Sequence, residues 1–169
     1  MSEVVQQHAA SAPKTVRCAV VTISDTRTLE TDSGGATVVH WLEKAGHAVA
    51  ARTIIPDEPE DMRKLIRWFA DDPAIDAILM TGGTGLSSRD QTYETVRSML
   101  SKELPGYGEL FRMLSYQAIG PAAMLSRALG GLVDATVVLT MPGSPAAVQL
   151  AMEKIIVFQL NHLVREARR

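Results

Sequence analysis

The chain has 169 residues, of which 46% are hydrophobic and 21% are charged, and its formal net charge is −2. This balance suits a single soluble globular domain, and the small negative charge excludes the basic field that draws proteins to nucleic acids or anionic membranes. No apolar run reaches the roughly 18 residues that a membrane-spanning helix needs. Cys18 is the only cysteine, so no intrachain disulfide forms, and a reducing, cytoplasmic location is expected.

The first fourteen residues, MSEVVQQHAASAPK, lack the basic start and the apolar core of a signal peptide. We expect a disordered polar tail over residues 1–14 and one folded domain over residues 15–169. Neither a linker nor an internal repeat interrupts that domain.

After the tail, short apolar runs alternate with segments of helical periodicity. In chain order the sequence predicts a strand at 17–23, a polar loop at 24–35, a helix at 36–45, a strand at 47–55, a helix within 56–73, a strand at 74–80, a glycine-rich loop, a helix at 91–102, a helix after the Pro-Gly pair at 105–106, a strand at 135–141 and a long helix from 144 onward. The strands do not alternate in polarity, which is typical of strands buried on both faces. This order favours an α/β fold with a mostly parallel sheet and helices on both of its faces.

The last helix is predicted to begin with Ser144 as its N-cap and Pro145 in its first turn. Its apolar residues occupy nearly the whole circumference, and a helix of that kind is buried on more than one side. The sheet covers one side, and a neighbouring subunit is the expected cover for the other. We therefore expect a homo-oligomer.

Ligands of open parallel sheets bind beyond the carboxyl ends of the strands, so the residues that leave those ends are the first candidates for a site. Small residues, hydroxyls and carboxylates gather at all four exits. They are Ser24, Asp25, Asp32, Ser33, Gly34 and Gly35 after the first strand, Pro56, Asp57 and Glu58 after the second, Thr81, Gly82, Gly83, Thr84, Gly85, Ser87, Ser88, Arg89 and Asp90 after the third, and Pro142, Gly143, Ser144 and Pro145 after the last. This convergence predicts a ligand site at one edge of the sheet.

The segment MTGGTGLSSRDQ, residues 80–91, carries three glycines within four positions directly after an apolar run. It lacks the Gly-Lys-Ser/Thr ending of a P-loop and the third glycine of a dinucleotide-binding turn. Successive backbone N–H groups before a helix still form a nest for anions, which favours a phosphate site. A plain tight turn is the alternative.

Asp57 and Asp90 are the acids best placed for chemistry at this edge, since each follows a buried strand. Two carboxylates that face bound phosphates are the usual way in which proteins hold Mg²⁺. The alternative role for each is a cap or a turn at the start of the next helix. Arg89 is expected either to neutralise phosphate or to pair with a surface carboxylate.

The segment TGGTGLSSRDQTYE resembles the MoaB/MogA family of molybdenum cofactor biosynthesis proteins, and the likeness is closest to the MoaB branch. Further segments match the family in the family's order: TISDTR with DSGG, IIPDE, LPGYGELFRMLSYQAIG, AMLSRALGG and MPGSPAAV. Together they span residue 16 to the last residue. One such segment is ordinary, whereas the ordered set is specific.

The resemblance implies a three-layer α/β sandwich of the molybdopterin-binding type, assembled as a homotrimer or homohexamer. In the catalytic branch it implies a molybdopterin adenylyltransferase, in which the terminal phosphate of molybdopterin attacks the α-phosphate of ATP bound with Mg²⁺, and pyrophosphate leaves. Molybdopterin and ATP would be the ligands and Mg²⁺ the cofactor, with no nucleic acid or membrane partner.

The family's metal-associated acids correspond to Asp57 and Asp90, which we expect to be the catalytic and metal-binding residues. The remaining expected contacts to substrate and nucleotide are Ser24, Asp25, Ser33, Gly34, Thr81, Gly82, Gly83, Thr84, Gly85, Ser88, Arg89, Pro142, Gly143 and Ser144. Charge neutralisation and in-line positioning would drive the transfer, so no general base is required.

Three other functions stay open. The chain could be an oligomer that binds molybdopterin or a precursor without transferring AMP, a nucleotide-processing enzyme like the related CinA N-terminal domains, or a structural protein with no ligand. The presence of both acids favours the transferase over the binding protein. The CinA loop usually continues with Asp-Asp, where this chain has Ser88, Arg89 and Asp90.

Overall fold

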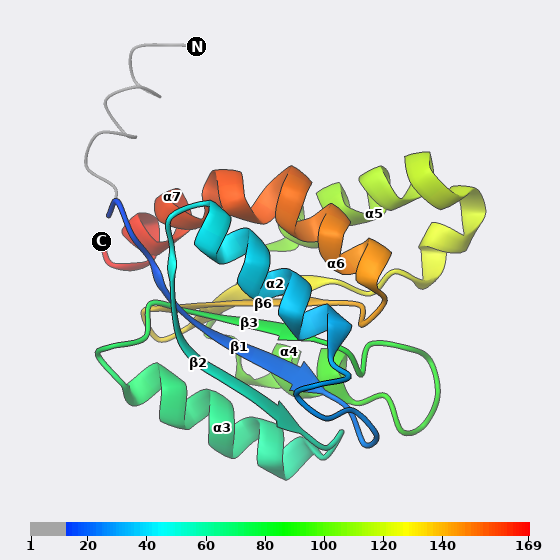
Figure 1. Cartoon of the computed structure of the whole chain (residues 1–169), viewed down its shortest axis with the longest axis horizontal. Coiled ribbons are helices and arrows are strands. Elements are labelled where there is room, and N and C mark those ends of the chain that lie inside the picture. The colour runs from blue at the N-terminus through cyan, green and yellow to red at the C-terminus, as the bar shows by residue number, and fades with distance from the viewer. Residues whose placement is uncertain (1–12) are drawn as a thin grey trace.

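The structure is a computed structural model, and it describes residues 13–169. Most of the polar tail expected over residues 1–14 therefore lies outside the described residues. Within the described part, no helix is long and apolar enough to cross a membrane. From residue 17 onward the chain builds a sheet between two layers of helices (Figure 1).

The sheet has six strands in the order β2-β1-β3-β6-β5-β4. Four of them run parallel: β1 (Arg17–Ile23), β2 (Ala48–Ile55), β3 (Ala77–Thr81) and β6 (Thr136–Met141). Of the other two, β5 (Leu129–Val133) runs against β6, and the short β4 (Lys102–Glu103) runs against β5. The mostly parallel sheet is confirmed. Its reversed strand, β5, begins where β6 ends.

Helices cover both faces of the sheet (Figure 1). One face carries α2 (Ser33–Lys44), α5 (Pro105–Ile119), α6 (Pro145–Ala151) and α7 (Val157–Ala167), with a 3-10 turn η1 (Gly120–Leu125) after α5 and a π-helical turn η2 (Met152–Ile156) between α6 and α7. The other face carries α3 (Pro59–Asp71) and α4 (Thr92–Met99). The three-layer sandwich is thereby confirmed.

Successive residues of the central strands enter two different cores. In β1, Cys18 and Val20 pack in the core under α2, α6 and α7, whereas Ala19 and Val21 pack with Met62 under α3. All five side chains are fully buried. A strand buried on both faces has no reason to alternate in polarity, which explains the unbroken apolar runs. Burial also raises the pKa of Cys18 to about 12, so its thiol stays protonated and inert.

The start of α2 differs from the sequence prediction. The helix begins at Ser33 rather than at residue 36, because the Asp32 carboxylate accepts a hydrogen bond from Gly35 N at 2.8 Å and caps it. The two glycines at 34–35 therefore lie in the first helical turn rather than at the end of a loop. Smaller shifts occur at β3, which spans 77–81, and at α4, which ends at Met99.

β5 is absent from the elements predicted above, because Gly130 and Gly131 weaken its strand signal. A Cβ atom on Gly131 would stand 2.3 Å from the carbonyl oxygen of Lys102 in β4. Glycine is therefore needed where these two strands approach each other.

Ser144 is confirmed as the N-cap of the last helical stretch, since its hydroxyl accepts a hydrogen bond from Ala147 N at 3.3 Å. The inner side of this stretch packs on the sheet, where Val148, Met152 and Leu160 are fully buried. On the outer side, Phe158 is 72% exposed. The neighbouring subunit expected to cover that side stays a prediction.

Candidate functional site

The carboxyl ends of β1, β2, β3 and β6 lie at one edge of the sheet because these four strands are parallel (Figure 1). The connections from β1 and β3 leave to opposite faces, since β1 leads to α2 and β3 leads to α4. In open α/β sheets the crevice beside such a reversal is the usual ligand site. The structure thus brings all four predicted exits to the same place.

The glycine-rich loop is packed tightly against the ends of β1 and β6. Gly82 donates its N–H to the carbonyl of Met141 at 3.1 Å, and a Cβ atom on Gly82 would stand 2.3 Å from the carbonyl oxygen of Ile23. Gly82 and Gly83 have φ values of 99° and 61°, in the left-handed region that favours glycine. No other residue would fit at Gly82 without moving the end of β1.

The first turn of α2 and the turn after β6 close around the same loop. The Thr81 hydroxyl donates to the carbonyl of Pro142 at 3.2 Å, and a Cβ atom on Gly34 would lie 3.4 Å from the carbonyl oxygen of Gly143. Together these segments border a hollow of about 110 Å³. Six residues of the predicted site line it: Ser24, Ser33, Gly34, Thr81, Gly82 and Gly143.

Asp32 serves the architecture of this hollow. Its carboxylate is buried and accepts hydrogen bonds from the Thr22 hydroxyl at 2.9 Å and from the Arg52 guanidinium at 3.1 Å, besides capping α2. The Asp32 carboxylate therefore holds the start of α2 against β1 and β2. Arg52 is not among the predicted residues, because it lies inside β2 and no local pattern in the sequence marks it.

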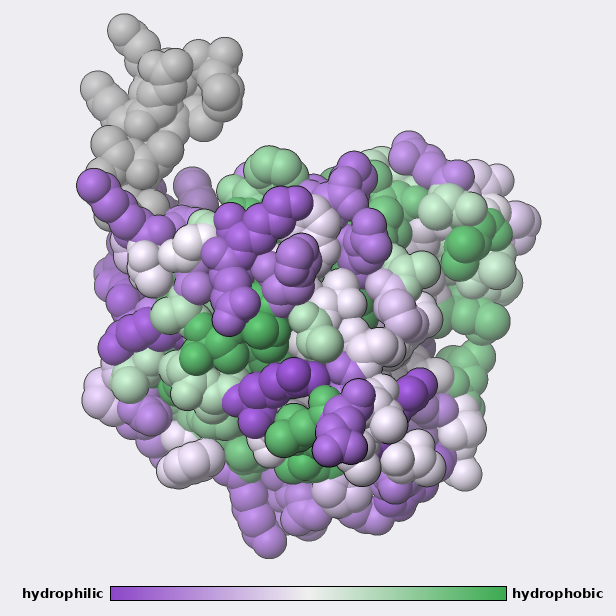
Figure 2. All heavy atoms as spheres, in the orientation of Figure 1, coloured by the Kyte–Doolittle hydropathy of each residue, from purple (hydrophilic) through white to green (hydrophobic). Residues whose placement is uncertain are grey.

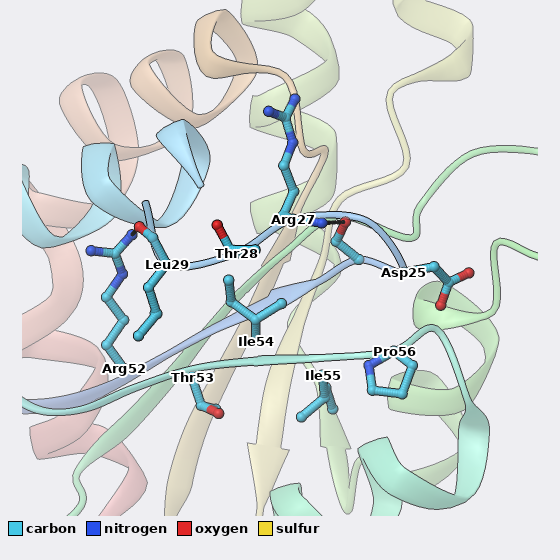
Figure 3. A pocket seen from close by; sticks show the side chains of 10 residues that line it. Asp25, Arg27, Thr28, Leu29, Arg52, Thr53, Ile54, Ile55 and Pro56 are labelled. Atoms are coloured by element: carbon cyan, nitrogen blue, oxygen red, sulfur yellow. Dashed lines mark hydrogen bonds between the residues drawn. The ribbon is translucent and has the colours of Figure 1, made fainter. Parts of the chain in front are cut away.

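A second, larger hollow of about 460 Å³ lies beside the end of β2, between that strand and the loop after β1 (Figure 3). The Ser24 hydroxyl shapes its rim by accepting hydrogen bonds from the backbone N–H groups of Thr26 and Arg27 at 3.2 and 3.1 Å. Figure 3 shows the side chains of Asp25 and Arg27 pointing away from each other. Asp25 is thus turned toward the segment after β3, where it meets Arg89.

Asp57 is buried beneath the glycine-rich loop, with 6% of its surface exposed. Its Oδ1 accepts a hydrogen bond from Gln91 N at 3.1 Å, and its own N–H donates to Asp25 Oδ1 at 3.1 Å. Burial raises the pKa of Asp57, and the nearby charges of Asp90 and Asp25 raise it further. A cation that enters the site would therefore stabilise the charged form of the Asp57 carboxylate.

The pKa of Asp90 is shifted in the opposite direction to that of Asp57. Its Oδ2 accepts hydrogen bonds from the hydroxyl and the backbone N–H of Ser87, at 2.6 and 3.1 Å. The hydroxyl bond is the main cause that lowers the pKa of Asp90 below its ordinary value. Asp90 does not cap α4, whose N-cap is Gln91 without a side-chain bond. Its carboxylate thus stays ionised beside the loop.

Arg89 pairs with two carboxylates. Its Nε and one terminal nitrogen donate to Asp25 at 2.8 and 3.0 Å, and the other donates to Glu58 at 2.5 Å. These bonds raise the pKa of Arg89 and lower that of Asp25. Of the two roles expected for Arg89, carboxylate pairing is the one seen here.

Ser144 and Ser88 are among the predicted residues that do not line the smaller hollow. Ser144 caps α6 and lines a separate hollow of about 290 Å³ against α5 and η1. Ser88 is exposed, and its carbonyl accepts a hydrogen bond from the side chain of Gln91 at 2.8 Å. Within residues 13–169, neither hydroxyl makes a hydrogen bond to another predicted site residue.

Arg127 is a site residue that the sequence analysis misses. Its Nε donates to the carbonyl of Thr84 at 2.8 Å, a second nitrogen donates to the carbonyl of Gly85, and the third pairs with Glu94. Its guanidinium carbon also lies 5.1 Å from the centre of the Tyr93 ring. Arg127 therefore ties the glycine-rich loop to α4. A lone arginine in a loop gives no signal of this role.

Many α/β proteins have polar loops at the carboxyl ends of their parallel strands. Comparison with known proteins shows to which family of these the chain belongs. Residues 19–162 match the family described as "Probable molybdopterin binding domain", and the chain belongs to that family.

Curated relatives match over almost their whole length. The chain is 51% identical over 163 residues to "Molybdenum cofactor biosynthesis protein B" of Halalkalibacterium halodurans, covering 96% of each chain. It is 49% identical over 166 residues to the protein of the same name from Bacillus subtilis, covering 98% of each.

Solved structures agree in fold. A crystal structure named "Molybdenum cofactor biosynthesis protein B" is 48% identical and superposes with a TM-score of 0.90, covering 94% of this chain and 99% of that one. A tungsten cofactor synthesizing protein MoaB from Pyrococcus furiosus is 35% identical, with a TM-score of 0.80 and coverage of 94% and 100%.

Proposed function

We propose that this protein acts in molybdenum cofactor biosynthesis as a molybdopterin adenylyltransferase, which transfers AMP from ATP to the terminal phosphate of molybdopterin. The family and the names of the relatives support the pathway. The adenylyl transfer rests on the arrangement of the site's own residues.

One observation carries the proposal: each acid lies against a glycine of the glycine-rich loop. A Cβ atom on Gly83 would stand 2.3 Å from Asp57 Oδ2, and one on Gly85 would stand 2.7 Å from Asp90 Oδ2. Backbone groups suited to phosphate thus adjoin carboxylates suited to a cation. A transfer between two phosphate-bearing substrates needs both together, because several negative charges must meet.

The donor set fits Mg²⁺ carried by a nucleotide. Within residues 13–169 there is no group of three or more His, Cys, Asp or Glu side chains placed to hold a metal. Mg²⁺ commonly takes only one or two carboxylates and completes its shell with waters and substrate phosphates. Asp57 and Asp90 would hold it, and it would neutralise phosphate charge at the reacting centre.

The chain's own residues would act by binding and orientation. The glycine-rich loop would present backbone N–H groups to phosphate oxygens. Arg127 fixes the shape of that loop. Thr81 and Gly34 hold the α2 and β6 turns at a fixed separation around the smaller hollow. The attacking group is an anionic phosphate, so no side chain has to remove a proton.

A homotrimer or homohexamer is part of the proposal. Several large apolar side chains are exposed on α5 and η1, where Figure 2 shows hydrophobic surface, and Phe158 is exposed on α7. The exposed residues on α5 and η1 are Leu110, Met113, Tyr116, Ile119, Met124 and Leu125. A monomer seldom leaves so much apolar surface together, and burial between subunits would remove it from water.

A second function is favoured by one contact. Arg89 is already neutralised by Asp25 and Glu58, as expected of a protein that does not use this guanidinium for ATP phosphates. In that case the chain would bind molybdopterin or a precursor without transferring AMP.

Pyrophosphate release decides between the two. The purified protein is mixed with molybdopterin, ATP and Mg²⁺, and molybdopterin binding is titrated in parallel. We expect release that needs both substrates and is lost in Asp90→Asn, while Glu60→Gln, which changes an exposed acid on α3, keeps it. Tight binding without release would reject the transferase, and full release from Asp90→Asn would reject the role of that acid.

A further inference from the structure

Thr92, the first residue of α4, carries a buried hydroxyl without a partner. The residue is fully buried, and its Oγ1 makes no hydrogen bond to any part of the chain that the structure describes. Its backbone is well anchored, since Thr92 N donates to the carbonyl of Gly83 at 2.9 Å. Buried hydroxyls are seldom left unpaired, because losing water without a replacement costs stability, so this one calls for a physical reason.

Helix geometry does not supply that reason. A threonine at the N-cap would bond the next N–H groups, but the N-cap of α4 is Gln91. Within a helix, threonine often bonds a carbonyl three or four residues earlier, yet Thr92 stands at the first position and makes no such bond. The hydroxyl therefore does nothing for the helix that valine would not do.

The hydroxyl shares a small space with Asp57. A Cβ atom on Gly83 would stand 2.2 Å from Thr92 Oγ1 and 2.3 Å from Asp57 Oδ2, so both oxygens border the place that a side chain would fill. Asp57 Oδ1 is used by Gln91 N, whereas no donor within residues 13–169 bonds Oδ2. The absence of a side chain at Gly83 thus lets two oxygens, neither bonded by a donor of the described chain, approach the same point of the glycine-rich loop.

We infer that the Thr92 hydroxyl is an oxygen ligand of the divalent cation at this site, binding the ion or one of its waters beside Asp57. The inference rests on the proposed function and names a residue that the sequence analysis does not select. Mg²⁺ and Mn²⁺ take oxygen ligands of this kind, and P-loop proteins use a threonine or serine hydroxyl similarly. A hydroxyl also adds a ligand without adding a third negative charge beside Asp57 and Asp90.

This role makes a prediction that a packing role does not. Replacing the hydroxyl by a methyl group of the same shape removes an unpaired polar atom from the interior, so the metal-free protein should not lose stability. Cation binding should weaken. A residue that only packs would lose neither stability nor cation affinity, because valine fills the same volume.

The test compares Thr92→Val and Thr92→Ser with the wild type, and Thr95→Val serves as the control. Thr95 is also buried on α4, and its side chain has no contact with the glycine-rich loop or Asp57 among the bonds of the described chain. The probe is Mn²⁺ alone, followed by water-proton relaxation, which needs no turnover. Urea unfolding of each metal-free protein gives the stability.

For Thr92→Val we expect Mn²⁺ affinity to fall about tenfold, as typically happens when a group supporting a metal site is lost. Its urea midpoint should be no lower than that of the wild type. Thr92→Ser should bind Mn²⁺ within about twofold of the wild type, because it keeps the hydroxyl. Thr95→Val should leave Mn²⁺ affinity unchanged.

Equal Mn²⁺ affinity in Thr92→Val and the wild type would overturn the inference, as would a wild type that binds no Mn²⁺. A lower urea midpoint with unchanged Mn²⁺ affinity would overturn it as well, and would give the Thr92 hydroxyl a structural role instead. Pyrophosphate release is measured separately. A Mn²⁺ site that depends on Thr92 in a protein without release would uphold the inference and remove the transferase.

Discussion

Asp57 and Gln91 are joined across the site, because the Asp57 carboxylate accepts the backbone N–H of Gln91 at 3.1 Å. The acid at the exit of β2 thereby fixes the start of α4, and with it the segment that follows the glycine-rich loop. A residue proposed to hold a cation is therefore also part of the local fold. Substitutions at position 57 have to separate these two roles.

Asparagine and alanine at position 57 should do so. Asp57→Asn keeps an oxygen that accepts the Gln91 N–H. Burial raises the pKa of the Asp57 carboxyl, which means that the charged form is unfavourable in the folded protein, so at pH 7 the uncharged variant should be at least as stable as the wild type. Asp57→Ala also loses the hydrogen bond and should be less stable than Asp57→Asn by about 1 kcal/mol. Both should lose pyrophosphate release. Urea unfolding and release assays measure the two effects, and equal stability of the variants would deny the bond any structural weight.

Arg127 should affect nucleotide binding through the glycine-rich loop. Arg127→Lys keeps the charge but cannot hold the carbonyls of Thr84 and Gly85 and the Glu94 carboxylate at once. Hydrogen bonds from a charged group contribute about 1.5–3 kcal/mol, so the KM for ATP should rise tenfold or more, at about 1.4 kcal/mol per tenfold.

Arg97→Lys is the matched control for that experiment, since Arg97 lies on α4 and, among the described residues, its side chain pairs with Glu103 at the surface. Its KM should match that of the wild type. An unchanged KM in Arg127→Lys would mean that the loop keeps its shape without this arginine.

Gly83→Ala should be more damaging than Gly46→Ala. Both glycines have positive φ values, 61° and 80°, so each substitution meets the left-handed backbone cost of about 1–2 kcal/mol. At Gly46 nothing lies within 4 Å of the added Cβ atom, whereas at Gly83 it would press on Thr92 and Asp57. Thermal unfolding of the pair measures the extra cost of the collision. Equal losses would show that Thr92 and Asp57 can move aside without a further loss of stability.

His47 should make the stability of the fold depend on pH. The side chain is buried, its Nδ1 accepts a hydrogen bond from Val16 N at 3.3 Å, and its Nε2 has no partner in residues 13–169. Burial lowers its pKa below the ordinary value of 6.5. Between pH 6.5 and the lower pKa of the folded state, His47 therefore binds a proton in the unfolded chain but not in the folded chain.

The free energy of unfolding should accordingly fall as the pH drops from about 7 through 6.5 and toward the folded pKa of His47, and level off beneath it. Above that window this group contributes no slope. His47→Asn, which retains an acceptor for Val16 N, should flatten the profile. Urea titrations between pH 5 and 8 measure it, and a wild-type profile without slope would contradict the assignment.

The parts of the site that could be predicted from the sequence are those that local pattern determines. The buried run at 17–23 forms a strand with the expected bounds, and parallel pairing then places the residues after each strand at one edge. Asp57 and the glycine-rich loop meet for that reason. The family segments add the identity of the fold, which the comparisons show.

The parts that could not be predicted depend on contacts between distant segments. Arg127 reaches the glycine-rich loop only because β5 is reversed, so that its first residues, rather than its last, lie at the site edge. A search confined to the carboxyl ends of parallel strands passes over it. The sequence around Thr92 does not mark it as a site residue, because only the three-dimensional structure shows that its hydroxyl is buried without a hydrogen-bond partner in the described chain. The Asp25–Arg89 pair likewise joins positions 64 residues apart.

The reversal of β5 also has a consequence for the order in which the protein matures. The glycine-rich loop leaves the ribosome well before Arg127, and α4, α5 and η1 are made in between. A nascent chain that ends at Ser126 therefore contains Asp57, Asp90 and the whole glycine-rich loop but not the arginine that gives the loop its shape. Nucleotide should protect such a chain from proteolysis no better than buffer does, and protection should begin only once β5 has paired with β6.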